Sequence, residues 1–339
     1  MAEPWDDMSL FSADTAARRT PVTVLTGFLG SGKTTVLNRL LRSPQFADTA
    51  VIINEFGAIG LDHLLVEAVD GEMVLLKSGC ICCSVRSDLE SSLRELLARR
   101  DDGRIGFVRI VVETTGLADP APIAQLTLNN PLTAPFLEPA RIVATVDAPY
   151  GVAHLREHWE ARKQIALADA VLLTQGDVAP HNVAALREAV ARLNPAAPQL
   201  ACTHGEVDPR VLLAPAASPA AMQATTPPPA HHHAHGEITS LTLEAEAPLD
   251  WLRVHAWLAR LREQHGERLL RVKGVLDLQG ETQPVAVHGI HHVFHPPVRL
   301  REWPAGPRQS RLVLIVRGPA VDFLRETFEQ EVLVAVDAR

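Results

Sequence analysis

The chain has 339 residues, of which 47% are hydrophobic and 21% charged, a composition typical of a folded globular protein and unlike that of a disordered or collagen-like chain. With 32 basic and 40 acidic residues its formal charge is −8, so no overall positive field favours binding to nucleic acid or to an anionic membrane. No apolar run reaches the roughly 18 residues of a membrane span, and the first residues lack the pattern of a secretion signal. We therefore expect a cytoplasmic protein, and the length suggests two domains.

Apolar runs typical of strands alternate with helical patterns over the first two thirds of the sequence. Residues 21–26 are rich in β-branched side chains and lead into a glycine, and residues 34–41 then carry apolar side chains at helical spacing. This alternation predicts an α/β fold, with a largely parallel sheet covered by helices on both faces. Further strands are expected at 50–54, 73–76, 105–113, 141–147 and 170–174, and further helices at 181–193 and after a capping box formed by Ser87 and Glu90.

The composition changes near residue 212, where Ala, Pro, Ser and Thr dominate up to a histidine tract, HHHAH. Such a segment is typical of a linker and marks a domain boundary. The patterns beyond it predict a smaller α+β domain of the split βαβ type. Its expected elements are a strand at 237–246, a helix with an apolar stripe from Trp251 to Leu261, strands near Leu269, Val285 and Leu312, a helix from Ala320 and a last strand from Glu331. The predicted division is a polar, flexible leader (1–19), an α/β domain (20–211), the linker (212–236) and a C-terminal domain (237–339).

The segment GFLGSGKTT, residues 27–35, matches the pattern G-x-x-x-x-G-K-[ST] between an expected strand and an expected helix. Glycines let the backbone N–H groups curl around phosphates, a lysine neutralises the phosphate charge, and the hydroxyl after it binds Mg²⁺. A glycine turn that binds nothing is the alternative, which the flanking elements disfavour. We predict a P-loop NTPase whose nucleotide contacts come from Gly27, Gly30, Ser31, Gly32, Lys33, Thr34 and Thr35, with Lys33 also catalytic and Thr34 a Mg²⁺ ligand.

Glu113 closes an apolar strand and is followed by two threonines and Gly116. A P-loop site needs an acidic group at a strand end to hold the magnesium shell, so we predict a Mg²⁺-binding and catalytic role for Glu113 and a γ-phosphate-sensing turn that includes Gly116. The alternative is a solvated carboxylate at the end of a strand.

The tetrapeptide Thr174-Gln175-Gly176-Asp177 follows another apolar strand, where a loop that reads the base would lie. We expect Thr174, Gln175 and Asp177 to contact the nucleotide, with the Asp177 carboxylate accepting hydrogen bonds from guanine N1 and N2. A strand followed by a turn aspartate is common, so this tetrapeptide alone is weak evidence.

Three cysteines fall within five residues, in GCICC at 79–83. Thiolate sulfurs suit Zn²⁺, and Co²⁺ or Cu(I) stay open. Three ligands cannot close a tetrahedron, so Cys80, Cys82 and Cys83 require a fourth ligand from elsewhere. A redox CxC pair or buried small residues are the alternatives. Cys202 stands apart and is expected to pack as a small apolar residue.

In this order the motifs resemble those of the CobW-like GTPases, the metallochaperone branch of the G3E group. The resemblance runs from Pro21 to about Arg317, and GCICC between a P-loop and an ETTG turn is its most specific feature. The matching segments are TGFLGSGKTT, INEFGAIGLD at 53–62, GCICC with VRSDL after it, ETTGLADP at 113–120, TVDA at 145–148, LNPAA from 193, HGEVDP from 204, RVKG from 271 and VHGIHHVF from 287.

The resemblance implies a GTPase domain followed by a CobW-type C-terminal domain, with GTP hydrolysis coupled to delivery of Zn²⁺ or Co²⁺ to a client metalloprotein. It implies that the three clustered cysteines bind the metal and that Glu55, in the switch region, is a further ligand and a catalytic residue. The histidines of the tract would collect metal at low affinity, although a polar tract that binds metal incidentally is the alternative; they are His231, His232, His233 and His235. A structural role is expected for His288, His291, His292 and His295.

One departure from the family pattern concerns the base loop, which usually has N/T-K-x-D. Gln175 stands where the lysine would stack over the purine, so a weakened guanine preference is expected. Two other functions compete with the chaperone: a metal-buffering or sensing protein that holds nucleotide as a structural ligand, and a P-loop kinase for a small molecule. The kinase is disfavoured because no acceptor site is evident, and a homo-oligomer is compatible with the sequence.

Overall fold

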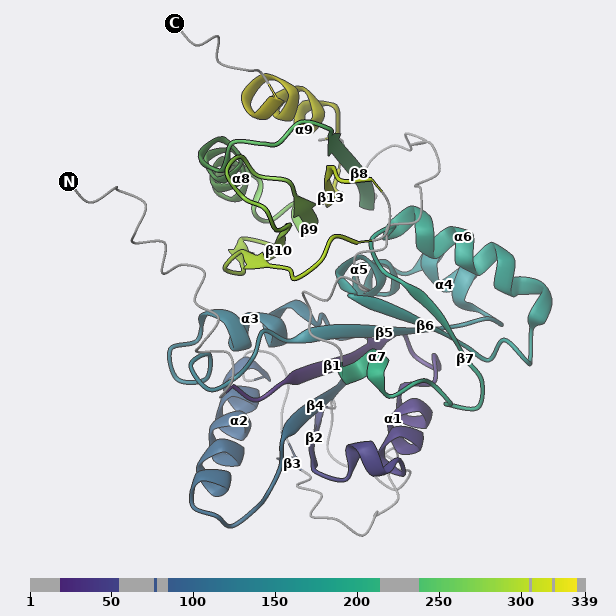
Figure 1. The fold of residues 1–339 in the computed structure, drawn as a ribbon. Helices are drawn as coiled ribbons and strands as arrows, with labels where there is room; N and C mark the ends of the chain where they lie inside the picture. Colours follow the sequence, from purple (N-terminus) through teal and green to yellow (C-terminus); the bar gives the residue numbers. More distant parts are fainter. Residues whose placement is uncertain are drawn as a thin grey trace, which may run out of the picture. The chain divides into compact units, whose positions relative to one another are not determined.

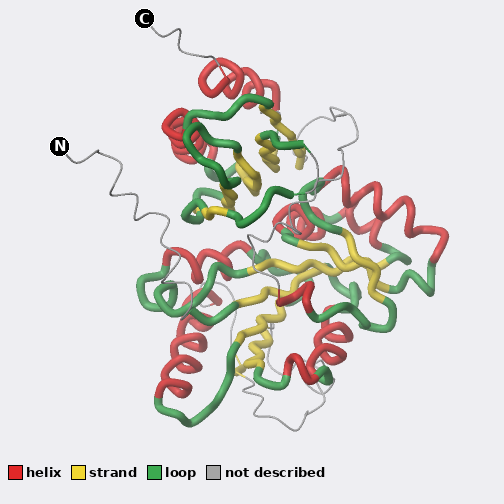
Figure 2. The backbone as a smooth tube through the Cα atoms, in the orientation of Figure 1, coloured by secondary structure: helices red, strands yellow, loops and turns green. Residues whose placement is uncertain are grey.

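The chain divides into two compact units, each with its own β-sheet (Figure 1). The computed structural model describes residues 19–54, 76–77, 85–213, 238–304, 307–318 and 321–333. Figure 2 marks the strands of both sheets in yellow. Within the described ranges, no helix is both long and apolar enough to cross a membrane.

The sheet of the first unit has seven strands in the order β3-β2-β4-β1-β5-β6-β7. Every neighbouring pair is parallel, so the carboxyl ends of all strands lie at one edge. β1 lies in the middle, between β4 and β5. The strands are β1 (Val22–Gly27), β2 (Thr49–Asn54), β3 (Leu76–Lys77), β4 (Arg109–Thr114), β5 (Arg141–Asp147), β6 (Ala170–Thr174) and β7 (Gln199–Cys202).

Helices cover both faces of this parallel sheet, as the sequence predicted. All residues of β1, β5 and β6 are buried, which requires cover on both sides. Figure 1 shows α1 on one side and α3 and α5 on the other. On the α1 side, Val36, Leu37 and Leu40 pack against Leu25 and Val111 in one apolar cluster. The helical elements are α1 (Lys33–Leu41), η3 (Pro44–Phe46), α2 (Val85–Asp101), α3 (Ala121–Asn129), α4 (Gly151–Glu157), α5 (Trp159–Leu167), η5 (Pro180–Asn182), α6 (Val183–Leu193) and α7 (Arg210–Leu213).

The second unit has an antiparallel sheet in the order β11-β10-β9-β13-β8, with β12 paired to β10. Because β13 is antiparallel to both β8 and β9, these two strands, joined by α8, run parallel on either side of it. This is the predicted split βαβ arrangement. Trp257 and Phe328 belong to its apolar core. The elements are β8 (Ile238–Ala245), α8 (Trp251–His265), β9 (Leu269–Leu276), β10 (Val285–Ile290), β11 (Val293–Phe294), β12 (Val298–Arg299), β13 (Ser310–Arg317), α9 (Val321–Phe328) and η7 (Glu329–Leu333).

Two sequence expectations about strands were wrong. The strand expected at 105–113 begins only at Arg109, because its partner β2 begins at Thr49 and pairing starts there. The strand expected from Glu331 is not present over 331–333, which form a π-helical turn that continues α9. Val332 extends the buried stripe of α9 and lies in the same apolar core, so its spacing fits a helix better than a strand.

Candidate nucleotide site

The P-loop connects the end of β1 to the start of α1 and requires glycine at two positions in particular. Gly27 has φ 146°, and a Cβ there would lie 2.3 Å from the Thr145 hydroxyl oxygen. Gly32 precedes the first residue of α1 with φ 89°. Both angles belong to the region that favours glycine, so the loop can turn its N–H groups inward next to the helix N-terminus. The Ser31 hydroxyl lies 2.6 Å from that of Thr145, which ties the loop to β5.

Lys33, the first residue of α1, lies over the P-loop. Its side chain is buried, and Nζ donates to the carbonyl oxygens of Gly27 (3.0 Å) and Phe28 (3.1 Å). Its positive charge is thus held at the amino end of α1, where the helix dipole also favours an anion. Thr35, in the same turn of α1, is exposed.

The predicted magnesium residues lie in contact. Thr34 Oγ1 donates to Glu113 Oε1 at 2.6 Å, and the Glu113 side chain is buried. The parallel pairing of β1 with β4 sets Leu25 opposite Glu113, so the carboxylate reaches the edge where α1 begins. A hydroxyl and a carboxylate side by side are hard oxygen donors, and this donor set fits Mg²⁺.

The turn after β4 is held by a residue that the sequence patterns did not identify. Gln164 of α5 donates from Nε2 to the carbonyl oxygens of Gly116 and Ala118, both at 3.0 Å, and its side chain is buried. Gly116 also lies against the P-loop, since a Cβ there would be 2.6 Å from Leu29 Cδ2. A glutamine among the buried apolar residues of α5 was the available signal, but its partners lie more than forty residues away in the chain.

Lys163 supports the same turn from the same helix. Its ammonium group lies 2.6 Å from Asp119 Oδ2, and Asp119 Oδ1 accepts from the N–H of Ala121 at the start of α3. Two adjacent residues of α5 therefore fix the segment from Gly116 to α3.

The predicted base loop lies beside the P-loop. Thr174 Oγ1 donates to Ser31 O at 2.8 Å, and Gln175 Nε2 donates to Gly30 O at 3.1 Å. Gln175 has φ 54°, an uncommon conformation for a residue other than glycine. Gln175 thus links the predicted base loop to the P-loop.

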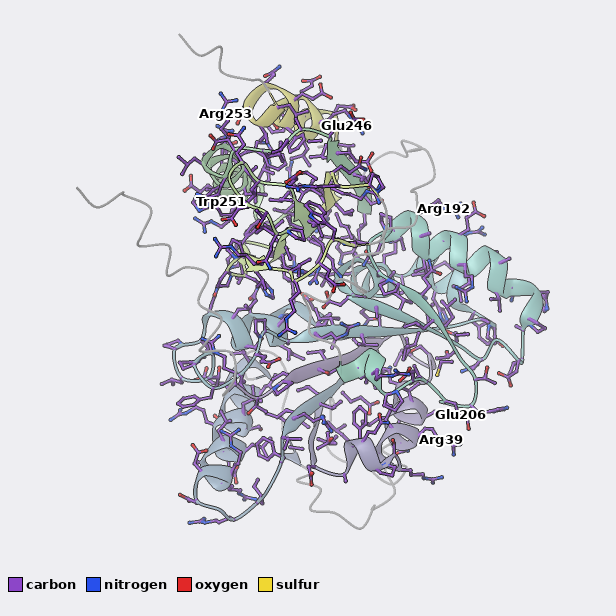
Figure 3. All side chains as sticks on the ribbon, viewed as in Figure 1. Arg39, Arg192, Glu206, Glu246, Trp251 and Arg253 are labelled. Atoms are coloured by element: carbon purple, nitrogen blue, oxygen red, sulfur yellow. The ribbon has the colours of Figure 1, made fainter. Side chains whose placement is uncertain are left out.

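A second loop, which the sequence analysis did not place at the site, reaches Asp177. His204 Nε2 lies 3.6 Å from Asp177 Oδ2. The next residue, Gly205, has φ 78°, and a Cβ there would meet Thr35 O at 2.8 Å, so this loop lies against α1. Figure 3 shows Arg39 of α1 beside Glu206, with which it forms an ion pair. The available signal was the position of His204 just beyond β7, at the edge where the other site loops follow their strands.

An aromatic cluster supports the P-loop from α4. The Phe28 ring stacks on His158 with centroids 4.5 Å apart and contacts His154 at 4.8 Å. His154 Nδ1 in turn lies 3.6 Å from an oxygen of the buried Asp147, at the end of β5. These contacts fix the apolar residue that follows Gly27.

The predicted metal residues lie outside the described ranges; they are Glu55, Cys80, Cys82, Cys83, His231, His232, His233 and His235. Among the residues that are described, no group of three or more histidine, cysteine, aspartate or glutamate side chains is arranged to hold a metal ion. Cys202 is buried in the apolar cluster beneath α1, as expected, and burial raises the pKa of its thiol to about 11. A thiol that stays protonated is a poor metal ligand.

Comparison with known proteins agrees with this geometry. Residues 21–201 match the CobW/HypB/UreG nucleotide-binding domain, and residues 238–332 match the C-terminal domain of the cobalamin synthesis protein cobW. The zinc chaperone YjiA of Escherichia coli is 34% identical over 276 residues, covering 80% of this chain and 86% of that protein. The zinc chaperone CobW of Pseudomonas aeruginosa is 30% identical over 337 residues, 87% of each. The crystal structure of Zn(II)-bound YjiA GTPase from E. coli matches with a TM-score of 0.71 at 28% identity, covering 92% of this chain and 99% of that one. The chain therefore belongs to the CobW/HypB/UreG family, in the branch that carries the CobW C-terminal domain.

Proposed function

We propose that this protein is a Mg²⁺-dependent GTPase that binds Zn²⁺, or Co²⁺, and couples its nucleotide state to delivery of the metal to a client metalloprotein. The observation that carries the nucleotide part is the hydrogen bond between Thr34 and Glu113, next to the buried Lys33. The relatives named zinc chaperones, together with the Zn(II)-bound YjiA GTPase, support the metal part.

Several groups of the chain bind the phosphates and the magnesium ion, each in a different role. The P-loop N–H groups and Lys33 bind the β- and γ-phosphates and offset their charge as it shifts during hydrolysis. Mg²⁺, held by Thr34 and Glu113, would supply further charge neutralisation at these oxygens. The turn at Gly116, fixed from below by Gln164, presents its backbone to the γ-phosphate. Hydrolysis would remove this contact and release the turn.

The base loop favours guanine through Asp177. Its carboxylate accepts two hydrogen bonds from guanine N1 and N2, which adenine cannot donate. Gln175 holds the loop by its bond to Gly30 O, but an amide offers a poorer surface over the purine than a lysine stem does.

The metal is the cargo and binds Cys80, Cys82 and Cys83. The sequence connects these cysteines to β3, which ends at Lys77, and to α2, which begins at Val85. Glu55 follows the last residue of β2, whose Asn54 pairs with Thr114. The segments that carry the glutamate and the cysteines thus leave the sheet at the same edge as Glu113, where a γ-phosphate would act on both. His231, His232, His233 and His235 would gather metal before transfer.

The deciding experiment measures metal affinity in two nucleotide states. Zn²⁺ or Co²⁺ is titrated against a chromophoric competitor in the presence of Mg²⁺ and either a non-hydrolysable GTP analogue or GDP. We expect near-stoichiometric binding that is tighter with the triphosphate by about 5 to 150-fold, and affinity that rises with pH as the thiols lose protons. The Cys82→Ala, Cys83→Ala double variant is the control and should lose this binding. Equal metal affinity in both nucleotide states would contradict the chaperone hypothesis and favour a metal-buffering protein.

A further inference from the structure

Two loops meet at Asp177, and both have an unusual backbone conformation there. Among the non-glycine residues that the structure describes, three have a positive φ, and two of these are Gln175 (54°) in the base loop and His204 (52°) in the loop that reaches it. A left-handed conformation is unfavourable for most residues and persists where surrounding contacts hold it, often at binding sites. The backbone is therefore held on both sides of Asp177.

Several contacts fix the turn that carries His204. Thr203 and Glu206 form an antiparallel bridge, in which the Glu206 N–H donates to Thr203 O at 2.9 Å. The two central residues, His204 and Gly205, both have a positive φ, as in a type I′ turn. Glu206 also pairs with Arg39 of α1 (Figure 3). The position of His204 is thus set by the same helix that begins at the P-loop.

This fixed turn presents an imidazole that does not belong to the core. The His204 side chain is 80% exposed, and its Nε2 lies 3.6 Å from Asp177 Oδ2. An ion pair as exposed as this one contributes little to stability. A flat, exposed ring beside a carboxylate that is proposed to bind guanine is instead suited to contact the base itself.

A purine bound at Asp177 would find little flat surface on the base loop. Gln175 Nε2 donates to Gly30 O at 3.1 Å, so this amide is already engaged with the P-loop. Histidine rings, like other aromatic side chains, stack on nucleic-acid bases. Stacking tolerates any base, because it uses the face of the ring system and not its edge.

We propose that His204 is a base-binding residue, whose imidazole stacks on the purine while Asp177 binds the purine's edge. This inference rests on the proposed function in one respect, that a nucleotide base occupies the loop at Asp177. The two contacts have different consequences, because the ring stabilises guanine and adenine alike whereas the carboxylate distinguishes them. His204 thus raises the affinity for any purine nucleotide, and Asp177 sets the preference for guanine.

The test compares variants of His204 in the full chain. His204→Asn keeps a residue that tolerates a positive φ and can hydrogen-bond to Asp177, but it removes the ring. His204→Phe and His204→Trp keep a ring. Isothermal titration measures the affinity for non-hydrolysable analogues of GTP and ATP and for inorganic tripolyphosphate, which has no base. We expect His204→Asn to weaken both nucleotides by about 5 to 50-fold, the aromatic variants to restore most of this affinity, and tripolyphosphate binding to stay unchanged throughout.

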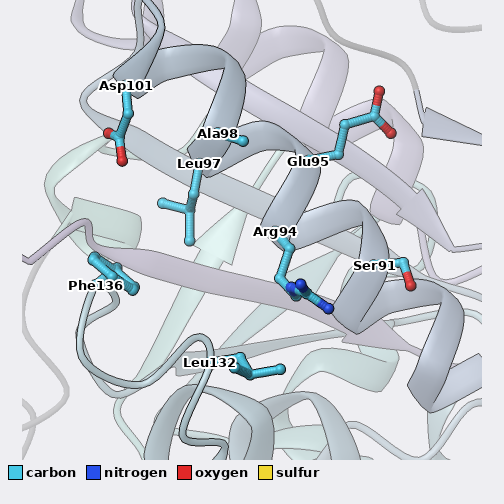
Figure 4. A pocket seen from close by; sticks show the side chains of 8 residues that line it. All are labelled: Ser91, Arg94, Glu95, Leu97, Ala98, Asp101, Leu132 and Phe136. Carbon is cyan, nitrogen blue, oxygen red and sulfur yellow. The ribbon is translucent and has the colours of Figure 1, made fainter.

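Phe136→Ala is the matched control for the loss of an exposed ring. Phe136 lines an open groove between α2 and the loop that follows α3 (Figure 4), and its carbonyl oxygen accepts from the N–H of Thr20, just before β1 begins. The P-loop follows the other end of β1. This variant should therefore bind all three ligands as the wild type does.

Equal nucleotide affinity in the wild type and His204→Asn would overturn the proposal. Weaker binding in both aromatic variants than in His204→Asn would also overturn it, because the imidazole would then act through a hydrogen bond. A loss that extends to tripolyphosphate would overturn it in favour of a turn that supports the P-loop. Failure of the proposed function is distinguishable: a wild type that binds GTP and ATP equally, but needs the ring for both, would contradict the guanine preference and support the stacking role.

Discussion

At the scale of single residues, the predicted phosphate site depends on the charge of Lys33 more than on the packing of its side chain. The Lys33 ammonium group donates to the carbonyl oxygens of Gly27 and Phe28 in the P-loop, so Lys33→Ala should remove charge compensation at this loop without opening the apolar core. We expect kcat for GTP to fall on the order of 100 to 1000-fold while the thermal midpoint stays near that of the wild type. Steady-state kinetics together with a melting curve provide the measurement. Wild-type turnover in the folded variant would show that the site is misassigned.

The Thr34 hydroxyl offers a matched pair of variants. Thr34→Ser keeps the oxygen that bonds to Glu113, whereas Thr34→Val replaces it with a methyl group of the same shape. The serine variant should retain Mg²⁺-dependent hydrolysis, and the valine variant should require much higher Mg²⁺ for any activity. A Mg²⁺ titration of the rate distinguishes them, and equal Mg²⁺ requirements would contradict the proposed ligand.

Cys202 gives a prediction about pH. Its thiol pKa of about 11 lies about two units above the ordinary value, so at pH 8 the folded thiol should react with iodoacetamide about a hundredfold more slowly than the unfolded one. Because the raised pKa favours the protonated thiol in the fold, its contribution to stability is complete below about pH 9 and is lost as the pH rises through 11. Mass spectrometry of the alkylated peptide measures the rate. Rapid labelling of native protein at pH 8 would contradict this burial.

At the scale of elements, α5 supports the turn after β4, which we propose senses the γ-phosphate. Gln164→Leu keeps the side-chain volume but leaves the carbonyls of Gly116 and Ala118 without that donor. We expect a loss of about 1–3 kcal/mol in the free energy of unfolding. Because Gln164 is a positioning residue, kcat should fall while KM for GTP changes little. Gln199→Leu, a similar change on β7 away from this turn, is the control. An equal fall in kcat there would point to a general loss of stability.

Local patterns predicted most of the first domain but not its tertiary contacts. The P-loop could be identified because its glycines, Lys33 and Thr34 are contiguous. The positions of Gln164 and His204 could not, since their partners lie far away in sequence and meet them only after folding. The strand expected from Glu331 failed because an apolar run alone does not distinguish a strand from the end of an amphipathic helix.

At the scale of the whole molecule, the proposed coupling requires reciprocity. If a triphosphate tightens metal binding by some factor, metal must tighten triphosphate binding by the same factor. We expect the affinity for a fluorescent GTP analogue to rise on addition of Zn²⁺ by the ratio found in the metal titrations. Isothermal titration with and without Zn²⁺ gives this ratio, and the Cys82→Ala, Cys83→Ala variant should show no change. Unequal ratios would mean that the two ligands do not share one linked equilibrium.

The insertion of β13 between β8 and β9 also sets an order of events during synthesis. Among the described strands of the parallel sheet around the P-loop, the last to be synthesised is β7, which ends at Cys202. β8 follows early in the second domain, yet in the described sheet its ladder partner is β13, which ends at Arg317. In a nascent chain β8 therefore has no strand to pair with while α8, β9 and β10 are synthesised. Such delayed pairing between distant segments is slow and prone to misassociation. Translation thus yields a folded nucleotide-binding domain well before the C-terminal sheet can close.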